Sequence, residues 1–133
     1  MRISTKGRHA VMAMVDLACH ATEKPVPLAE VAQRQTISLS YLEQLIAKLK
    51  KNGLVKSMRG PGGGYVLAQP ANQMSVHQIV MAVDTGSSAT KAGHDEAKKD
   101  ARHLTDCLWL KMSNEVQKFL KSVTLEDVAQ DKM

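Results

Sequence analysis

Cysteine is scarce in this sequence, which has Cys19 and Cys107 as its two thiols in 133 residues. Two cysteines are too few for the disulfide framework of a small secreted domain, so both are interpreted as reduced free thiols. No apolar run approaches the roughly 20 residues that a membrane-spanning helix needs, and Asp16 interrupts the apolar stretch that follows Arg8. These absences exclude a disulfide-stapled scaffold and a membrane partner, and they predict a soluble, cytoplasmic protein.

Signatures of enzymes are also lacking. The sequence shows no nucleophile–base pair, no metal-binding motif and no nucleotide-binding fingerprint. Its glycine-rich stretch, Arg59–Gly64, lacks the Gly-Lys-Ser/Thr ending of a phosphate-cradling loop and does not precede a helix. We therefore predict that the chain is not an enzyme.

Positive charge is concentrated in the first half of the chain. The formal net charge is +5, and residues 1–60 carry ten Lys and Arg against four Asp and Glu. The remaining residues are slightly acidic, with eight Lys and Arg against nine Asp and Glu. A basic half favours a polyanionic partner, although a merely solvated surface has the same composition.

Apolar periodicity predicts three helices in the basic half. The first runs from Thr5 to about His20, the second covers Leu28–Gln33, and the third runs from Ser38 or Ser40 to Lys51. Ser40-Tyr41-Leu42-Glu43 matches a capping box, and Asn52-Gly53 suits the C-terminal cap of the third helix. A short helix, a tight connection and a second amphipathic helix together predict a helix-turn-helix.

A β-hairpin is predicted directly after the helix-turn-helix. Two short β-like runs, Leu54–Met58 and Tyr65–Ala68, flank a turn that contains half of the eight glycines. The glycines fit a plain turn or a functional tip equally well, but the neighbouring Lys56 and Arg59 favour the tip. The fold class is therefore mainly α with a small β-hairpin wing, a winged helix-turn-helix domain over residues 1–83.

The second half predicts a loop and a long helix. Ser75 suits the N-cap of a helix over 76–83, residues 84–102 lose all apolar periodicity, and a long apolar stripe begins near His103. Thr124 resembles the cap of a further helix within the last segment, residues 103–133. The stripe predicts dimerisation of two copies, whereas folding back over the N-terminal domain is the alternative.

The helix-turn-helix predicts how DNA is read. The N-terminal end of its second helix enters the major groove, which here presents Ser38, Ser40, Tyr41, Glu43 and Gln44. Glutamine pairs with adenine and glutamate accepts from the cytosine amino group, while capping alone is the other interpretation of Glu43. The partner predicted is double-stranded DNA with an imperfect palindrome.

Basic residues outside that end complete the predicted interface. Lys48 and Lys51 suit phosphate contacts, which fix the register on DNA without reading its sequence. Arg59 at the wing tip suits a narrow minor groove, with Gly60 beside it. Arg8 of the first helix is the remaining predicted DNA contact.

Several strings of this sequence resemble the IscR-like iron–sulfur cluster regulators. The most specific are Ser-Tyr-Leu-Glu-Gln at 40–44 and Arg-Gly-Pro-Gly-Gly-Gly-Tyr at 59–65, and the likeness extends from residues 2–11 to Thr124-Leu125. The resemblance implies a homodimeric bacterial winged-helix transcription factor, a repressor or activator of genes for iron–sulfur cluster assembly. It also implies a 2Fe–2S cluster bound in the loop before the long helix.

The chain departs from that family in the cluster loop. Where three cysteines are expected, alanines stand at a similar spacing, at Ala92, Ala97 and Ala101. Asp106 stands where the family's histidine is expected. With the nearby His103 and Cys107, it is a candidate replacement ligand. Deliberate removal of the site and a natural member that senses differently both remain open, and the alanine spacing favours removal. Because such clusters are held mainly by thiolates, we predict a cluster-free chain.

Two functional hypotheses follow. The first is a sequence-specific DNA-binding transcription regulator in an apo form. The alternative is a redox- or metal-sensing module that binds a protein through its hairpin and reads no specific DNA. A steep dependence of binding on salt distinguishes the two, because bound Lys and Arg release counterions from phosphate.

Overall fold

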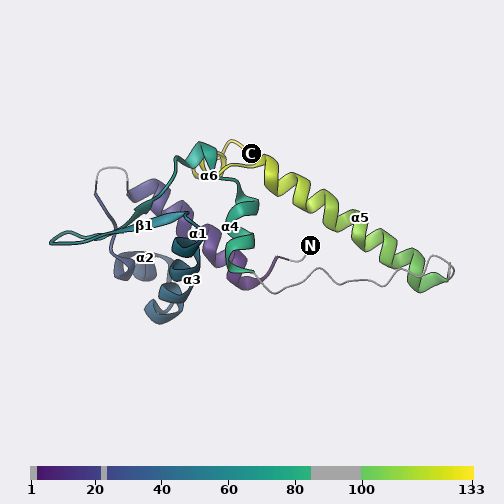
Figure 1. Ribbon diagram of the computed structural model, residues 1–133, viewed down its shortest axis with the longest axis horizontal. Coiled ribbons are helices and arrows are strands. Elements are labelled where there is room, and N and C mark those ends of the chain that lie inside the picture. Colours follow the sequence, from purple (N-terminus) through teal and green to yellow (C-terminus); the bar gives the residue numbers. More distant parts are fainter. Residues whose placement is uncertain (1–2, 22–23, 85–99) are drawn as a thin grey trace.

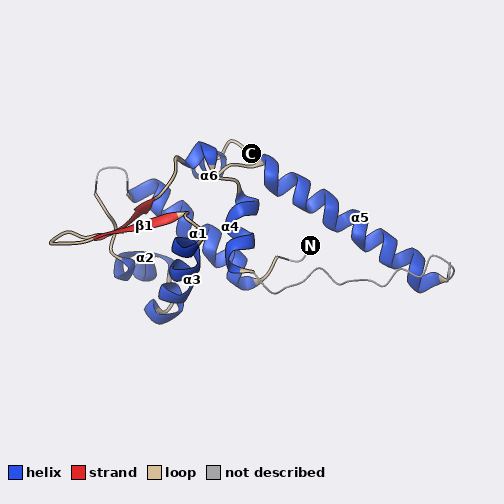
Figure 2. Ribbon diagram, viewed as in Figure 1, coloured by secondary structure: helices blue, strands red, loops and turns tan. Residues whose placement is uncertain are grey.

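The computed structural model describes residues 3–21, 24–84 and 100–133, and it is mainly helical with one hairpin (Figures 1 and 2). The predicted loop therefore lies largely outside the described residues. In chain order the elements are α1 (Thr5–His20), α2 (Leu28–Gln35), α3 (Leu39–Lys51), β1 (Val55–Met58), β2 (Gly64–Leu67), the 3-10 helix η1 (Ala71–Gln73), α4 (Val76–Val83), α5 (Ala101–Ser122) and α6 (Leu125–Ala129).

The hydrophobic core surrounds α1, which contacts α2, α3, α4, α6 and β2. From α1 the side chains of Met14 and Leu17 are buried, and from α6 Leu125 is buried. The stripe predicted for the third helix is confirmed, because its apolar members are at most 2% exposed; they are Leu42, Leu45, Ile46 and Leu49. Burial of one face of α3 leaves the opposite face available to a partner.

The start of α3 differs from the predicted capping box. Ser38 is the N-cap, and its hydroxyl accepts a hydrogen bond from the backbone N–H of Tyr41 at 3.2 Å. This register places Ile37 just before the cap and Leu42 four residues into the helix, where both pack in the core as a hydrophobic staple does. A cap at Ser40 would have put the exposed Gln44 at the second of these positions. The capping interpretation of Glu43 is therefore wrong.

The predicted hairpin is confirmed. Some of its glycines form the turn, and one lets the backbone of another segment approach closely. Strands β1 and β2 pair antiparallel with Met58 opposite Gly64, and Gly60 has φ +108°, a backbone conformation that favours glycine. Gly64 meets the backbone of Val26, where an ideal Cβ would lie 2.4 Å from the Val26 carbonyl oxygen. Hydrogen bonds between Val26 and Tyr65, at 2.8 and 3.0 Å, fix the hairpin to the segment before α2.

The remaining predicted caps are confirmed. Ser75 caps α4 and Thr124 caps α6, each in a reciprocal capping box. Asn52 ends α3, and Gly53 follows it with φ +74°. The predicted second helix extends two residues further than expected, to Gln35, and the long helix begins at Ala101.

The long helix α5 projects away from the rest of the fold (Figure 1). Its last turn packs Leu120 beside Val76, Val80 and Val123, whereas Leu104, Leu108 and Phe119 are each more than half exposed. The alternative in which this stripe folds back over the N-terminal domain is therefore wrong. No helix of the described ranges is both long and apolar enough to cross a membrane.

Candidate nucleic-acid interface

The outward face of α3 carries the residues predicted to read bases. At about 100° per residue, the buried stripe leaves the opposite side of the helix to five exposed side chains. They are Ser40, Glu43, Gln44, Ala47 and Lys51. Ser40, Glu43 and Gln44 therefore lie together near the N-terminal end of the helix, as a reader of the major groove requires.

The turn that precedes α3 is tight. Thr36 ends α2 in the left-handed region, with φ 56° and ψ 47°, and its N–H donates to carbonyls of α2. Ile37, partly buried, then packs against the core, and Ser38 caps α3. Three residues thus separate the two helices, as in a helix-turn-helix.

A buried carboxylate fixes α2 against α1. Asp16 of α1 is 3% exposed, and its two oxygens accept from Arg34 Nη2 at 2.7 Å and Arg34 Nε at 3.0 Å. Gln35 Nε2 donates to the same carboxylate at 2.8 Å, and His20 lies 3.5 Å away. Because α2 leads directly into the turn and α3, this cluster also helps to position α3.

Tyr41 is held by α1 rather than pointing freely outward. Its hydroxyl hydrogen-bonds with Nδ1 of His9 at 2.9 Å, and the two rings meet edge-on with centroids 5.4 Å apart. Burial raises the pKa of the Tyr41 phenol above its ordinary value of 10.0. Sequence reasoning missed His9, because no local pattern connects it to a residue 32 positions later.

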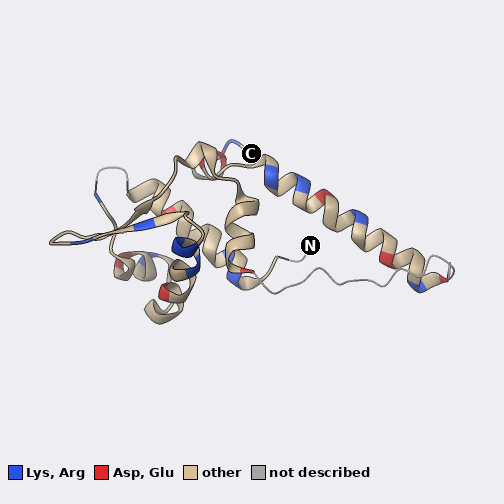
Figure 3. Ribbon diagram, in the orientation of Figure 1, with Lys and Arg blue, Asp and Glu red and all other residues tan. Residues whose placement is uncertain are grey.

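Cations lie on α3 and on the hairpin (Figure 3). Lys50 in the last turn of α3 donates from Nζ to Ser57 Oγ of β1 at 3.2 Å, which links the helix to the wing. Lys51 is exposed and Lys48 is half-buried, both in the same turn. Arg59 and Gly60 are exposed at the wing tip, and Arg8 is exposed on α1.

The predicted cluster positions are only partly described. Ala92 and Ala97 lie outside the described residues, and Ala101 is the first residue of α5 rather than part of a loop. In α5, the sulfur of Cys107 lies 3.8 Å from Nε2 of His103, and Asp106 is half-buried. Among the described residues, no group of three or more His, Cys, Asp and Glu side chains could hold a metal ion. One thiol and one imidazole do not fit a cluster that needs about four ligands, mostly thiolates.

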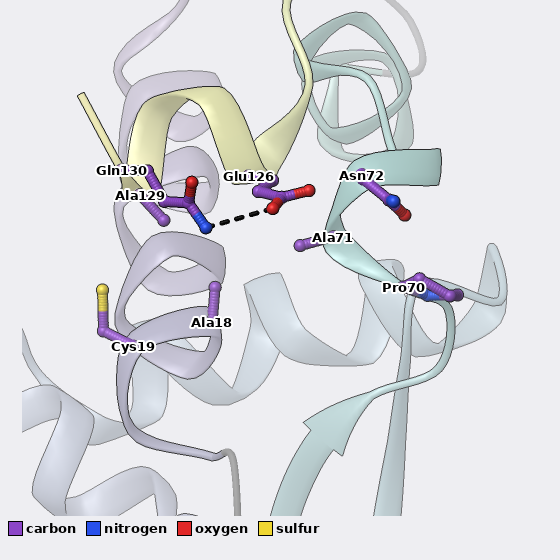
Figure 4. A pocket seen from close by; sticks show the side chains of 8 residues that line it. All are labelled: Ala18, Cys19, Pro70, Ala71, Asn72, Glu126, Ala129 and Gln130. Atoms are coloured by element: carbon purple, nitrogen blue, oxygen red, sulfur yellow. Dashed lines mark hydrogen bonds between the residues drawn. The ribbon is translucent and has the colours of Figure 1, made fainter. Parts of the chain in front are cut away.

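An open pocket of about 470 Å³ lies apart from these residues (Figure 4). It is lined by the end of α1, by Pro70–Asn72 and by α6. Its polar groups are partly paired, since Gln130 Nε2 donates to Glu126 Oε1 at 3.0 Å. None of the predicted DNA contacts lines it.

A helix-turn-helix followed by a two-stranded wing, with the predicted base-contacting face exposed, defines a winged-helix DNA-binding protein. The chain belongs to the Rrf2 family, described as iron-dependent transcriptional regulators, whose profile matches residues 3–131. The predicted resemblance to IscR-like regulators is confirmed. The chain is thus a DNA-binding transcription regulator and not an enzyme.

Individual relatives agree with this assignment. The chain is 48% identical over 133 residues to the HTH-type transcriptional regulator IscR of Pectobacterium atrosepticum, covering 99% of this chain and 81% of that protein. It is 49% identical over 129 residues to IscR of Photorhabdus laumondii, covering 96% and 79%. Such relatives favour the regulator over the protein-binding alternative.

Solved structures show the same fold. T. potens IscR aligns with a TM-score of 0.80 at 40% identity, covering 100% of this chain and 89% of that one. CymR, the global cysteine regulator of B. subtilis, aligns with a TM-score of 0.82 at 35% identity, covering 98% and 97%.

Proposed function

We propose that this chain is a cytoplasmic, homodimeric regulator that reads an imperfect palindrome and controls genes of iron–sulfur cluster assembly. The observation that carries the reading role is the exposed row of Ser40, Glu43 and Gln44 at the N-terminal end of α3. The identity of the controlled genes rests on the IscR relatives alone.

Each element has a separate task on DNA. Gln44 suits adenine, whose N6 and N7 match both ends of the amide, and Glu43 suits the cytosine amino group. With its capping role removed, Glu43 is free to read. The cations at the end of α3 contact phosphates, and Arg59 enters the minor groove beside the half-site.

Dimerisation supplies the two-fold symmetry that a palindrome requires. The support is the apolar stripe of α5, where Leu104, Leu108 and Met112 are 59%, 54% and 48% exposed in the single chain. A patch of this kind on an isolated helix is typical of a surface that a second copy covers. Pairing through α5 would hold two copies of α3 at a fixed separation.

The salt dependence of DNA binding tests the interface. We expect tight binding to a palindromic duplex, weak binding to a scrambled one, and a steep loss of affinity with salt. Arg59→Ala should weaken binding by about 1–2 kcal/mol, or roughly five- to thirtyfold, and reduce the salt slope by about one. Fluorescence anisotropy at several salt concentrations measures both quantities.

The matched control is Lys132→Ala, which removes one positive charge from an exposed position far along the chain from the wing. Its affinity should stay close to that of the unmodified protein. Equal losses for the two variants would contradict the wing assignment and leave only a general effect of charge. Equal binding of both duplexes would contradict specific reading.

We further propose that the chain works without a cluster. The two cysteines lie on different elements, Cys19 at the end of α1 and Cys107 on α5. Anaerobic reconstitution with iron and sulfide should therefore leave no visible absorption band and no bound iron after desalting. A stable chromophore with two irons and two sulfides per chain would contradict this proposal, and DNA affinity measured before and after treatment should be the same.

A further inference from the structure

The N-terminal end of α3, where the predicted base contacts lie, carries one large apolar side chain that is not buried in the core. Leu39, the first residue of the helix, is 41% exposed. Each of the other leucines of α3, and its isoleucine, is at most 2% exposed. Leu39 thus has a different role from the residues that share its hydrophobic character.

Helix geometry places Leu39 beside the predicted readers. Glu43 lies four residues later, one turn further along the helix, so its side chain is a neighbour of Leu39; Ser40 lies about 100° around the helix, on the other side of Glu43. Both neighbours are exposed and polar. Leu39 therefore lies at the end of α3 that enters the major groove, where side chains reach base edges.

The major groove offers one apolar group to such a side chain. Donors and acceptors distinguish most base edges there, whereas the 5-methyl group of thymine is recognised by apolar contact. Serine, glutamate and glutamine cannot make that contact favourably. We propose that Leu39 is a specificity-determining residue that packs against a thymine methyl group in each half-site. The proposal rests on α3 being the reading helix.

The surroundings of Leu39 favour DNA over a protein as the group that covers it. The exposed face continues into Lys50 and Lys51, and the wing adds Lys56 and Arg59. The cores of protein–protein interfaces are depleted in lysine, whereas protein–DNA interfaces are strongly positive. DNA offers the same combination to this surface. The thymine methyl group matches Leu39, and the phosphates match the surrounding lysines and arginine.

A thymine-to-uracil scan tests the proposal, because uracil lacks only the methyl group. The probe is a palindromic duplex selected from a random-sequence pool with the unmodified protein, with deoxyuridine placed at one symmetric pair of thymines at a time. We expect one position at which the change weakens binding by about fourfold per half-site, as loss of one buried methyl-sized group predicts. Leu39→Ala should bind the thymine and uracil duplexes equally at that position.

Two further variants separate the possible failures. Leu39→Met keeps an apolar side chain of similar volume and should retain most of the difference between thymine and uracil. Gln44→Ala should weaken binding yet keep that difference, because it leaves Leu39 in place. Matching thermal unfolding of the variants would show that the fold is retained.

The outcomes differ clearly. If Leu39→Ala shows the same ratio of thymine to uracil affinity as the unmodified protein at every position, or if no position responds to the methyl group, the proposal is overturned. If Gln44→Ala also leaves the affinity for the palindrome, and the preference for it over the scrambled duplex, unchanged, then α3 is not the reading helix and the proposed function itself fails. Loss of the ratio in Leu39→Ala alone supports the assignment.

Discussion

Arg34→Met should lower the free energy of unfolding by about 3 kcal/mol at neutral pH, because it leaves a buried carboxylate without its cation. Asp16 is 3% exposed, and Arg34 supplies two of the three side-chain hydrogen bonds that its oxygens accept. We place the effect at the low end for a broken buried pair because Gln35 and His20 remain nearby. Urea unfolding measures this difference. Arg8→Met, at an exposed position of α1, is the matched control and should change stability little.

The same cluster predicts a pH dependence with a defined sign. Burial raises the pKa of Asp16, but hydrogen bonds from Arg34 and Gln35 and the charge of Arg34 outweigh it, so the pKa lies below its ordinary value of 3.8. A carboxyl with a depressed folded pKa stabilises the protein above its unfolded pKa, and this stabilisation is lost as the pH falls through the folded pKa. We therefore expect the unmodified protein to lose stability below about pH 4.

Arg34→Met should change that profile. Without the guanidinium, burial dominates and raises the pKa of Asp16, so protonation removes the unpaired charge as the medium becomes acidic. The difference in the free energy of unfolding between the unmodified protein and the variant should therefore become smaller as the pH falls from about 6 to about 4. Parallel stability profiles for the two proteins over this range would contradict the role assigned to the Asp16–Arg34 pair.

If two copies pair through α5 as proposed, Leu108→Glu should convert the dimer into monomers and weaken binding to a palindrome by about a hundredfold or more. Leu108 is 54% exposed in the middle of the α5 stripe, and a carboxylate there would have to be desolvated on dimerisation. In a dimer, binding of one α3 holds the second α3 next to the other half-site, and this raises the overall affinity. A monomer lacks this increase. Sedimentation or light scattering gives the oligomeric state, and anisotropy gives the affinity.

The control for this variant lies on the same helix. Asn114 is exposed and faces away from the stripe by helix geometry, so Asn114→Glu should leave the dimer and the affinity unchanged. If Leu108→Glu stays dimeric while Asn114→Glu dissociates, the interface uses the opposite face of α5. A monomeric unmodified protein would contradict dimerisation altogether.

The sequence by itself determined the elements whose signals are local. The stripe from Leu42 to Leu49, the capping boxes at Ser75 and Thr124, and the hairpin around the glycines each depend on residues within a few positions of one another. Periodicity and capping hydrogen bonds act over that range, so the pattern and the structure agree. The winged helix-turn-helix followed from these elements, and the proposed base-reading residues rest on them.

Tertiary structure decided what depended on distant residues. Ser38 and Ser40 both suited a cap, and the packing of Leu42 in the core and of Ile37 against it goes with Ser38. Three long-range contacts had no local signature: Asp16 with Arg34, His9 with Tyr41, and Gly64 against Val26. Each joins segments that meet only when the core has formed, and side-chain pairing of this kind depends on packing rather than on periodicity.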